Sequence, residues 1–320
     1  MFGRGKLLTL VAVIFVVAWG IGGWFLPGPL AKDTEFVVKD GESFNTVAEH
    51  LQAAGAISSP LTFKARARLL GGGAPIKAGN FVLPRGASQR TLVDILQGGK
   101  VVRRFVTVPE GMPSIMVAER LAAQPLLTGD AITPPEGSVL PDTYEIAAGE
   151  SRQAVVLRMQ AAMQRVLKEL WDKRSPATVA KTPEEALILA SIVEKETGKP
   201  SERAMVAGLY SNRLRKGMML QADPTIIYPI TRGKPLGRRI RQSEIAAVNG
   251  YNTYAMTGLP EGPITNPGRA SIEAVLNPAS TDALYMVADG TGGHAFAATL
   301  EEHNRNVAKW FAIRRARGEL

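Results

Sequence analysis

The sequence contains no cysteine, and this absence excludes disulfide bonds and metal sites built from thiolates. It does not identify a reducing compartment, because an exported protein can also fold without disulfides. Histidine is scarce as well: the three histidines, His50, His294 and His303, are too scattered to suggest a histidine-rich metal site. We therefore predict no metal centre.

Positive charge is in excess, but its distribution does not favour nucleic-acid binding. The formal net charge is +9 at pH 7, and the charges are spread along the chain. Local basic clusters such as Arg232–Arg241 contain no interleaved aromatic residues. A basic surface outside the membrane would instead suit anionic lipid or an anionic wall polymer, and a solvated face is the common alternative. We predict no nucleic-acid partner.

One long uncharged segment, Leu7–Leu26, has the length of about 20 residues that spans a bilayer. Arg4 and Lys6 precede it, so the positive-inside rule keeps residues 1–6 in the cytoplasm and exports everything after the segment. A cleaved signal peptide is the alternative, but its apolar core is usually about 7–15 residues long, and no small-x-small cleavage site follows. We predict an uncleaved single-pass anchor over residues 7–27.

The rest of the chain has the composition of a folded protein, and its length of 320 residues allows about two domains. Two segments, Val38–Ala53 and Val108–Ala123, share a pattern at the same spacing. Each predicts a strand, a glycine turn and an amphipathic helix. The first copy also resembles a LysM module, a small βααβ unit that binds carbohydrate; a spacer domain is the alternative. We predict a LysM-like domain over residues 33–100 and a second α/β repeat with a connecting region over residues 101–178.

Periodicity and stop signals predict further elements. Helices are expected over Pro60–Leu70, Gln89–Gln97, Ser151–Asp172, Ser201–Lys216, Ser271–Leu276 and Glu301–Arg315, and strands over Gly79–Leu83 and Ala283–Val287. Between Gly217 and Ala270 the chain is rich in proline, glycine and asparagine, which predicts structured loops.

The segment Thr182–Gly198 predicts a helix with caps at both ends and a carboxylate on its apolar face. Its buried stripe consists of Ala186, Leu189, Ile192 and Val193. Glu196 continues this stripe, whereas the Glu194 side chain is expected to be somewhat more exposed to solvent. A desolvated carboxyl has a raised pKa, as a general acid working near neutral pH requires. The alternative is that Glu196 is an ordinary surface residue of the last helical turn.

Polar and aromatic loops follow this helix, and they include LQADPTIIY at Leu220–Tyr228, YNTY at Tyr251–Tyr254 and NPG at Asn266–Gly268. Amide and hydroxyl groups beside aromatic rings are typical of a sugar-binding site. Each of these motifs alone is also a common turn sequence. Taken singly, none of them identifies a site.

Taken together, the ordered motifs SIVEKET, NRL, LQADPTIIY, YNTY, GLPEGPI, NPG and VADGTGGHAF resemble the MltG/YceG-type endolytic murein transglycosylases. The match covers most of Glu136–Arg305 and includes the anchor and the LysM-like region. Glu261 departs from the pattern, because the family commonly has proline there. The resemblance implies an α+β fold with an N-terminal transmembrane helix, one or more LysM-like α/β modules and a C-terminal lysozyme-like mixed α+β catalytic domain over residues 179–320.

The resemblance also implies roles for individual residues. The EKET element resembles the Glu-Ser signature of lysozyme-like soluble transglycosylases, in which the catalytic glutamate directly precedes the hydroxyl residue. This places the catalytic role on Glu196, before Thr197. The expected substrate-positioning residues are Gln221, Asp223, Tyr228, Asn252 and Tyr254. A role for Asp223 in capping the loop before Pro224 is nearly as well supported.

The activity that the resemblance implies is cleavage of the bond between N-acetylmuramic acid (MurNAc) and N-acetylglucosamine (GlcNAc) in nascent peptidoglycan strands. No water is consumed, 1,6-anhydro ends form, strand elongation ends, and no metal or cofactor is required. The protein would act from the bacterial inner membrane, with its catalytic domain outside the cytoplasm and peptidoglycan synthases as partners. Two alternatives stay open: a non-catalytic glycan-binding scaffold, and a hydrolytic muramidase with Asp223 as second carboxylate.

Overall fold

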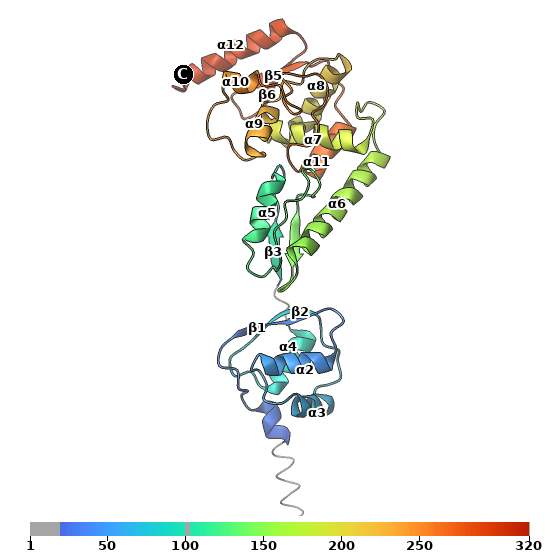
Figure 1. The fold of residues 1–320 in the computed structure, drawn as a ribbon, viewed down its shortest axis with the longest axis vertical. Coiled ribbons are helices and arrows are strands. Elements are labelled where there is room, and N and C mark those ends of the chain that lie inside the picture. Colours follow the sequence, from blue (N-terminus) through green and yellow to red (C-terminus); the bar gives the residue numbers. More distant parts are fainter. Residues whose placement is uncertain (1–19, 100–102, 320) are drawn as a thin grey trace, which may run out of the picture. The chain divides into compact units, whose positions relative to one another are not determined.

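The computed structural model describes residues 20–99 and 103–319 (Figure 1). The chain divides into two compact units. One extends to Arg104 and includes Glu145–Ala148; the other holds Phe105–Tyr144 and everything from Gly149 onward. Within the described residues, no helix is both long and apolar enough to cross a membrane. The predicted anchor lies mostly outside the described residues, as does the short segment before it.

The N-terminal unit is built on a two-stranded antiparallel sheet, in which β1 (Thr34–Val38) pairs with β2 (Gly79–Leu83). Three helices accompany the sheet: α2 (Phe44–Ala53), α3 (Pro60–Leu70) and α4 (Gln89–Gly98). A serine caps the start of each helix by accepting a hydrogen bond from a backbone N–H three residues on. Phenylalanine and leucine side chains fill the core. The predicted bounds of α3 and β2 are confirmed.

Both copies of the predicted repeat contain a strand, a glycine turn and a helix. In the second copy, β3 (Arg104–Thr107) and α5 (Ser114–Ala122) flank Gly111, as β1 and α2 flank Gly41. The two glycines have φ of 74° and 71°, a left-handed conformation that other residues rarely adopt. The equivalent helix residues are buried in both copies, namely Val47 and Leu51, and Val117 and Leu121. β3 pairs with β4 (Thr143–Ile146).

The C-terminal unit has a helical core. The long helix α6 (Arg152–Asp172) leads to α7 (Pro183–Glu196), and α8 (Arg203–Arg215) follows a short 3-10 turn over Pro200–Glu202. Helix α11 (Arg269–Leu276) packs against α6, α7 and α8, which Figure 1 shows gathered in one part of the unit. A hairpin of β5 (Tyr285–Ala288) and β6 (His294–Ala297) and the helix α12 (Leu300–Ala316) complete it.

Helix α7 forms as its sequence predicts. The Thr182 side chain accepts a hydrogen bond from the Glu185 N–H at 3.2 Å, and Pro183 occupies the first turn. Its buried residues are Ala186, Leu189, Ala190, Ser191, Ile192 and Val193, so neighbours cover more of its surface than one stripe. This central position fixes the direction of the side chains at its C-terminal end.

Three features differ from the sequence prediction. The stretch predicted as loops contains two helices, α9 (Asp223–Thr231) and α10 (Gln242–Ile245). In α9, Pro224 lies in the first turn, where the missing N–H costs no helical hydrogen bond, so proline there is compatible with a helix. The sequence predicts neither strand β4 nor strand β6. Ser201 does not cap the next helix, because it lies inside the 3-10 turn and α8 begins at Arg203.

Candidate active site

Glu196 is the last residue of α7, and its carboxyl is buried at the edge of the helical core. Oε1 has no hydrogen-bond partner among the described residues, whereas the hydroxyl of Tyr210 forms a hydrogen bond with the carboxylate. Burial raises the pKa of Glu196 to about 7, and the charge of Asp223 adds to the rise. The Tyr210 hydrogen bond and the Arg213 charge oppose it. Such a carboxyl is protonated in a large fraction of molecules near neutral pH, as a general acid must be.

Glu194 lies in a different environment from the one predicted. Its side chain is only 5% exposed. Its carboxylate accepts a hydrogen bond from the Gly268 N–H at 2.9 Å and lies 3.6 Å from the guanidinium of Arg203. The expectation that the Glu194 side chain is more exposed to solvent is therefore wrong, because the turn at Gly268 covers this face of α7. These partners tie the Glu194 carboxylate into the fold.

Glu196 opens onto a pocket of about 240 Å³ in the C-terminal unit. Four predicted site residues, Glu196, Gln221, Asp223 and Tyr254, line it together. The other lining residues are Leu209, Tyr210, Arg213, Leu220, Met286, Val287, Ala288 and His294. The pocket therefore combines one desolvated carboxyl with several hydrogen-bonding groups, which is an arrangement suited to acid–base chemistry on a polar substrate.

Asp223 and Gln221 are held by a neighbouring loop. The Tyr254 hydroxyl donates a hydrogen bond of 2.6 Å to Asp223 Oδ1. Gln221 has a φ of 53°, unusual for a residue other than glycine, and its N–H donates to the Thr253 carbonyl oxygen at 3.1 Å. Asp223 is the first residue of α9, and the N-cap position before it is occupied by Ala222. The Asp223 carboxylate therefore has a hydrogen-bond partner among the residues that line the pocket.

Tyr228 does not line this pocket. Its ring lies 4.8 Å from that of Tyr251, measured between centroids, and its hydroxyl forms a hydrogen bond with Glu136. Burial raises the pKa of Glu136, while its hydrogen bonds with Ser114 and Tyr228 lower it. Tyr228 therefore belongs to a separate polar cluster.

Asn252 does not line the pocket either, because it is completely buried. Its Nδ2 donates to three backbone carbonyl oxygens, those of Glu244 at 3.3 Å, Ile245 at 2.9 Å and Ala247 at 2.6 Å. Its Oδ1 accepts a hydrogen bond from the Tyr254 N–H at 3.0 Å. The Asn252 side-chain amide makes its hydrogen bonds within the loop, so we assign Asn252 to positioning Tyr254.

Comparison with known proteins identifies the family. The sequence model of the YceG-like family matches residues 36–309. This chain belongs to the YceG-like family.

Several relatives have a described activity or structure. The chain is 28% identical over 338 residues to an endolytic murein transglycosylase of Bacillus subtilis, and the alignment covers 91% of each protein. It is 29% identical over 365 residues to an endolytic murein transglycosylase of Streptococcus pneumoniae, covering 95% of this chain but 65% of that longer protein. A crystal structure of a YceG-like protein from Listeria monocytogenes has a TM-score of 0.56 and 27% identity, covering 86% of this chain and 98% of that chain. The mixed α+β fold is therefore that of YceG-like proteins.

Three further residues of this YceG-like pocket carry chemistry that the sequence did not single out. Tyr210 is buried against Glu196, and Arg213 is 8% exposed, with its Nε donating to the Leu284 carbonyl oxygen at 2.7 Å. His294 lines the pocket, and its Nδ1 lies 2.9 Å from Glu202 Oε2. Arg213 and His294 do stand in the motifs NRL and VADGTGGHAF, which was the available signal. Their roles depend on contacts that only the fold provides.

Proposed function

We propose that this protein is an endolytic peptidoglycan lytic transglycosylase. It cleaves MurNAc–GlcNAc bonds within nascent glycan strands, leaves 1,6-anhydroMurNAc ends and thereby terminates strand elongation. The observation that carries the proposal is the Glu196 carboxyl, whose pKa burial raises to about 7 in a pocket lined by hydrogen-bonding side chains. The names of the Bacillus subtilis and Streptococcus pneumoniae relatives support the reaction class.

One carboxyl is sufficient for both steps of this reaction. Glu196 first donates its proton to the glycosidic oxygen, and the bond from that oxygen to C1 of MurNAc breaks. The resulting carboxylate then removes the proton from the 6-hydroxyl of the same sugar, whose oxygen forms a bond to C1. The proton returns to Glu196, no water is consumed, and no metal or cofactor takes part. Positioned acid–base catalysis typically contributes about 10²- to 10⁴-fold.

The remaining pocket residues position the sugars in this proposal. Gln221, Asp223 and Tyr254 supply amide, carboxylate and hydroxyl groups to the substrate's hydroxyl and acetamido groups. Asn252 and Tyr228 contribute indirectly, through the loops that they hold. A lysozyme-like character of residues 179–320 is part of the same proposal.

A hydrolytic muramidase is the second candidate, and one observation favours it: Asp223 lines the same pocket as Glu196. A second carboxylate can activate water or stabilise the cleaved sugar, and the products then carry ordinary reducing ends. The third possibility is a non-catalytic scaffold of the wall-synthesis machinery, which binds glycan and produces no new ends.

The proposed location follows from the N-terminal sequence. Residues 7–27 would anchor the protein once in the inner membrane, with residues 1–6 in the cytoplasm. The LysM-like domain (33–100) would contact glycan, residues 101–178 would connect it, and residues 179–320 would carry the catalytic site outside the cytoplasm, beside peptidoglycan synthases. Tethering raises the local concentration of the site around nascent strands. An exported form without the anchor should therefore complement a deletion strain poorly, and full complementation would contradict the anchor's role.

The test is mass spectrometry of the products that the purified full chain makes from uncrosslinked peptidoglycan strands. We expect internal fragments that end in an anhydro sugar and are one water lighter than hydrolysis products. Glu196→Gln should abolish these fragments. In Glu194→Gln, the molecules that fold should still cleave the strands. Reducing ends would establish the muramidase, and strands left intact by the wild type would favour the scaffold. Normal cleavage by Glu196→Gln would refute the assignment of the acid.

A further inference from the structure

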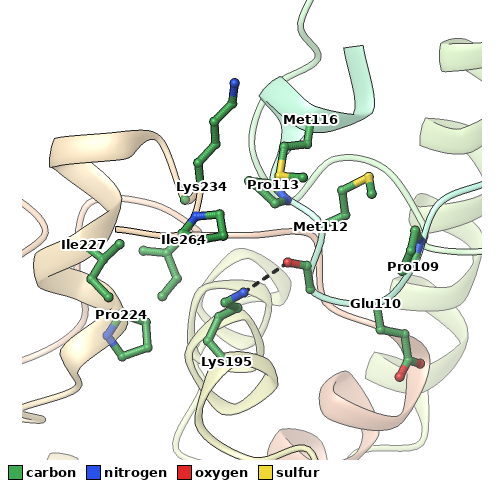
Figure 2. Close-up of a pocket in the computed structure, with 13 residues that line it drawn as sticks. Pro109, Glu110, Met112, Pro113, Met116, Lys195, Pro224, Ile227, Lys234 and Ile264 are labelled. Carbon is green, nitrogen blue, oxygen red and sulfur yellow. Dashed lines mark hydrogen bonds between the residues drawn. The ribbon is translucent and has the colours of Figure 1, made fainter. Parts of the chain in front are cut away.

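A second pocket, of about 460 Å³, lies in the same unit and has a different character (Figure 2). Pro224 and Ile227 of α9 form one side, and Met112, Pro113 and Met116 form the opposite side, as Figure 2 shows. No aromatic, asparagine or glutamine side chain is among its described lining residues. Its volume is in the range of small-molecule and peptide sites.

This pocket shares two elements with the catalytic pocket. Lys195 lines it from the last turn of α7, and the next residue, Glu196, lines the catalytic pocket. Pro224 lines it from the first turn of α9, and the preceding residue, Asp223, lines the catalytic pocket. Consecutive helical residues point about 100° apart, so the two pockets open on neighbouring faces of the same two helix ends.

Lys195 is the cation of this pocket with capacity for a ligand. Its ammonium can donate three hydrogen bonds, and among the described residues it makes one, of 3.4 Å, to the Gly111 carbonyl oxygen, drawn in Figure 2. Lys234 lies at the rim and pairs with Glu119 at 2.5 Å. The acidic group of the lining, Glu110, is itself paired with Arg203 at 3.0 Å.

These features fit a peptide better than a sugar. Sugars are bound through many hydrogen bonds to amides and carboxylates and through contacts with aromatic rings, whereas this lining has no aromatic or side-chain amide group among its described residues and its carboxylate, Glu110, is paired with Arg203. Methionine, proline and isoleucine accommodate small apolar side chains, and methionine adapts its shape to them. A lysine ammonium at the edge of an apolar pocket favours a carboxylate, since partial desolvation strengthens the charge-assisted hydrogen bond.

We propose that this pocket binds the peptide stem of the substrate through contacts with its small apolar side chains, and that Lys195 receives a free carboxylate of the stem. The proposal rests on the proposed function, because a peptidoglycan strand carries such a stem on the lactyl group of each MurNAc. An extended peptide advances about 3.3–3.6 Å per residue, so three to five residues cover roughly 10–18 Å. A helix with its side chains is about 10–12 Å across. A stem that begins at a sugar in the catalytic pocket is therefore long enough to cross the width of a helix such as α7.

The first test compares two substrates: uncrosslinked strands with intact stems, and the same strands after an amidase has removed the stems. We expect the wild type to have a kcat/KM about ten-fold higher on the stem-bearing strands, as one charge-assisted hydrogen bond provides. Lys195→Met, which keeps the length and apolar character of the side chain, should reduce this ratio to nearly one. Lys309→Met, an exposed lysine of α12, is the matched control and should keep the wild-type ratio. A ratio of one in the wild type, or an unchanged ratio in Lys195→Met, would overturn the proposal.

The second test does not require turnover, so it separates this proposal from the proposed function. A free stem pentapeptide is titrated into the full-length Glu196→Gln protein and into Glu196→Gln with Lys195→Met, and binding is followed by calorimetry. Saturable binding that Lys195→Met weakens about ten-fold supports the pocket even if no strand is cut. Absence of saturable peptide binding, or peptide binding that Lys195→Met leaves unchanged, would refute it.

Discussion

The hydroxyl of Tyr254 donates a hydrogen bond of 2.6 Å to Oδ1 of Asp223 and so joins a loop to the first residue of α9 at the wall of the catalytic pocket. The same carboxylate raises the pKa of Glu196 through its charge. This hydrogen bond therefore affects both the orientation of the Asp223 carboxylate and the protonation of Glu196.

Removal of the Tyr254 hydroxyl should weaken substrate binding. In Tyr254→Phe the Asp223 carboxylate loses its donor, and a hydrogen bond to a charged group contributes about 1.5–3 kcal/mol. We expect KM on uncrosslinked strands to rise by about ten-fold or more, with a smaller change in kcat, in steady-state measurements. The matched control is Tyr144→Phe, since the Tyr144 hydroxyl donates to the Leu140 carbonyl oxygen outside the pocket. An unchanged KM in Tyr254→Phe would show that the bond serves only the fold.

The pH dependence of the rate should report the raised pKa of Glu196. The first step needs the protonated carboxyl, and burial raises its pKa to about 7. We expect kcat/KM to decline above pH 7, by about ten-fold for each further pH unit. A decline that begins between pH 4 and 5, near the ordinary value for glutamate, would mean that the working acid is exposed to water.

Tyr210→Phe should move this decline to higher pH. The Tyr210 hydrogen bond lowers the pKa of Glu196 because it stabilises the carboxylate, so its removal leaves the effect of burial less opposed. The phenylalanine ring keeps the buried volume, and the fold should be retained. The measurement is kcat/KM as a function of pH for the wild type and for Tyr210→Phe. If the two rates decline at the same alkaline pH, the assignment of Glu196 as the general acid is contradicted.

Ionised Glu196 should cost the folded protein stability at high pH. Below about pH 4.5 the carboxyl is protonated in folded and unfolded chains alike, whereas above about pH 7 the folded chain carries a desolvated charge. The free energy of unfolding therefore decreases as pH rises through this window, by about 3 kcal/mol in total. Glu196→Gln should match the wild type at low pH and be more stable at pH 8, in urea unfolding followed by circular dichroism. A free energy of unfolding that falls with pH equally in Glu196→Gln and in the wild type would contradict this prediction.

Asn252→Ala should act on stability. The substitution leaves three carbonyl oxygens without the Nδ2 donor and the Tyr254 N–H without its acceptor. Loss of buried hydrogen bonds of this kind costs about 1–3 kcal/mol. Thermal unfolding should show a lower Tm for Asn252→Ala and an unchanged Tm for Asn304→Ala on the exposed surface of α12. Equal Tm values would contradict the structural role of the Asn252 amide and would favour the predicted contact between Asn252 and the substrate.

The sequence predicts the local elements well because their signals are local. The cap at Thr182 and the apolar stripe fix α7, and they also place Glu196 among apolar neighbours. The environment of Glu194 was predicted wrongly because its partner is Gly268, 74 residues later in the chain. Spacing along one helix cannot describe a turn that covers it from elsewhere.

The residues that line the pocket were harder to predict, because the pocket also depends on contacts between distant parts of the chain. Asn252 and Tyr254 stand in one motif, yet one is buried inside the loop and the other lines the pocket. Composition does not distinguish them, because asparagine and tyrosine suit both positions. Tyr210 looks in sequence like a core residue of α8, and its contact with Glu196 arises only when α7 and α8 pack together.

The catalytic pocket is assembled from residues that extend from Glu196 to His294. A chain whose synthesis has just passed Glu196 already contains this carboxyl, but it lacks the β5–β6 hairpin, whose residues line the pocket. Until that hairpin folds back onto α8, the Glu196 carboxyl has only part of the surroundings that raise its pKa. Under the proposed function, the capacity to cut glycan is therefore a property of the finished fold, because the pocket is complete only when the residues up to His294 have folded.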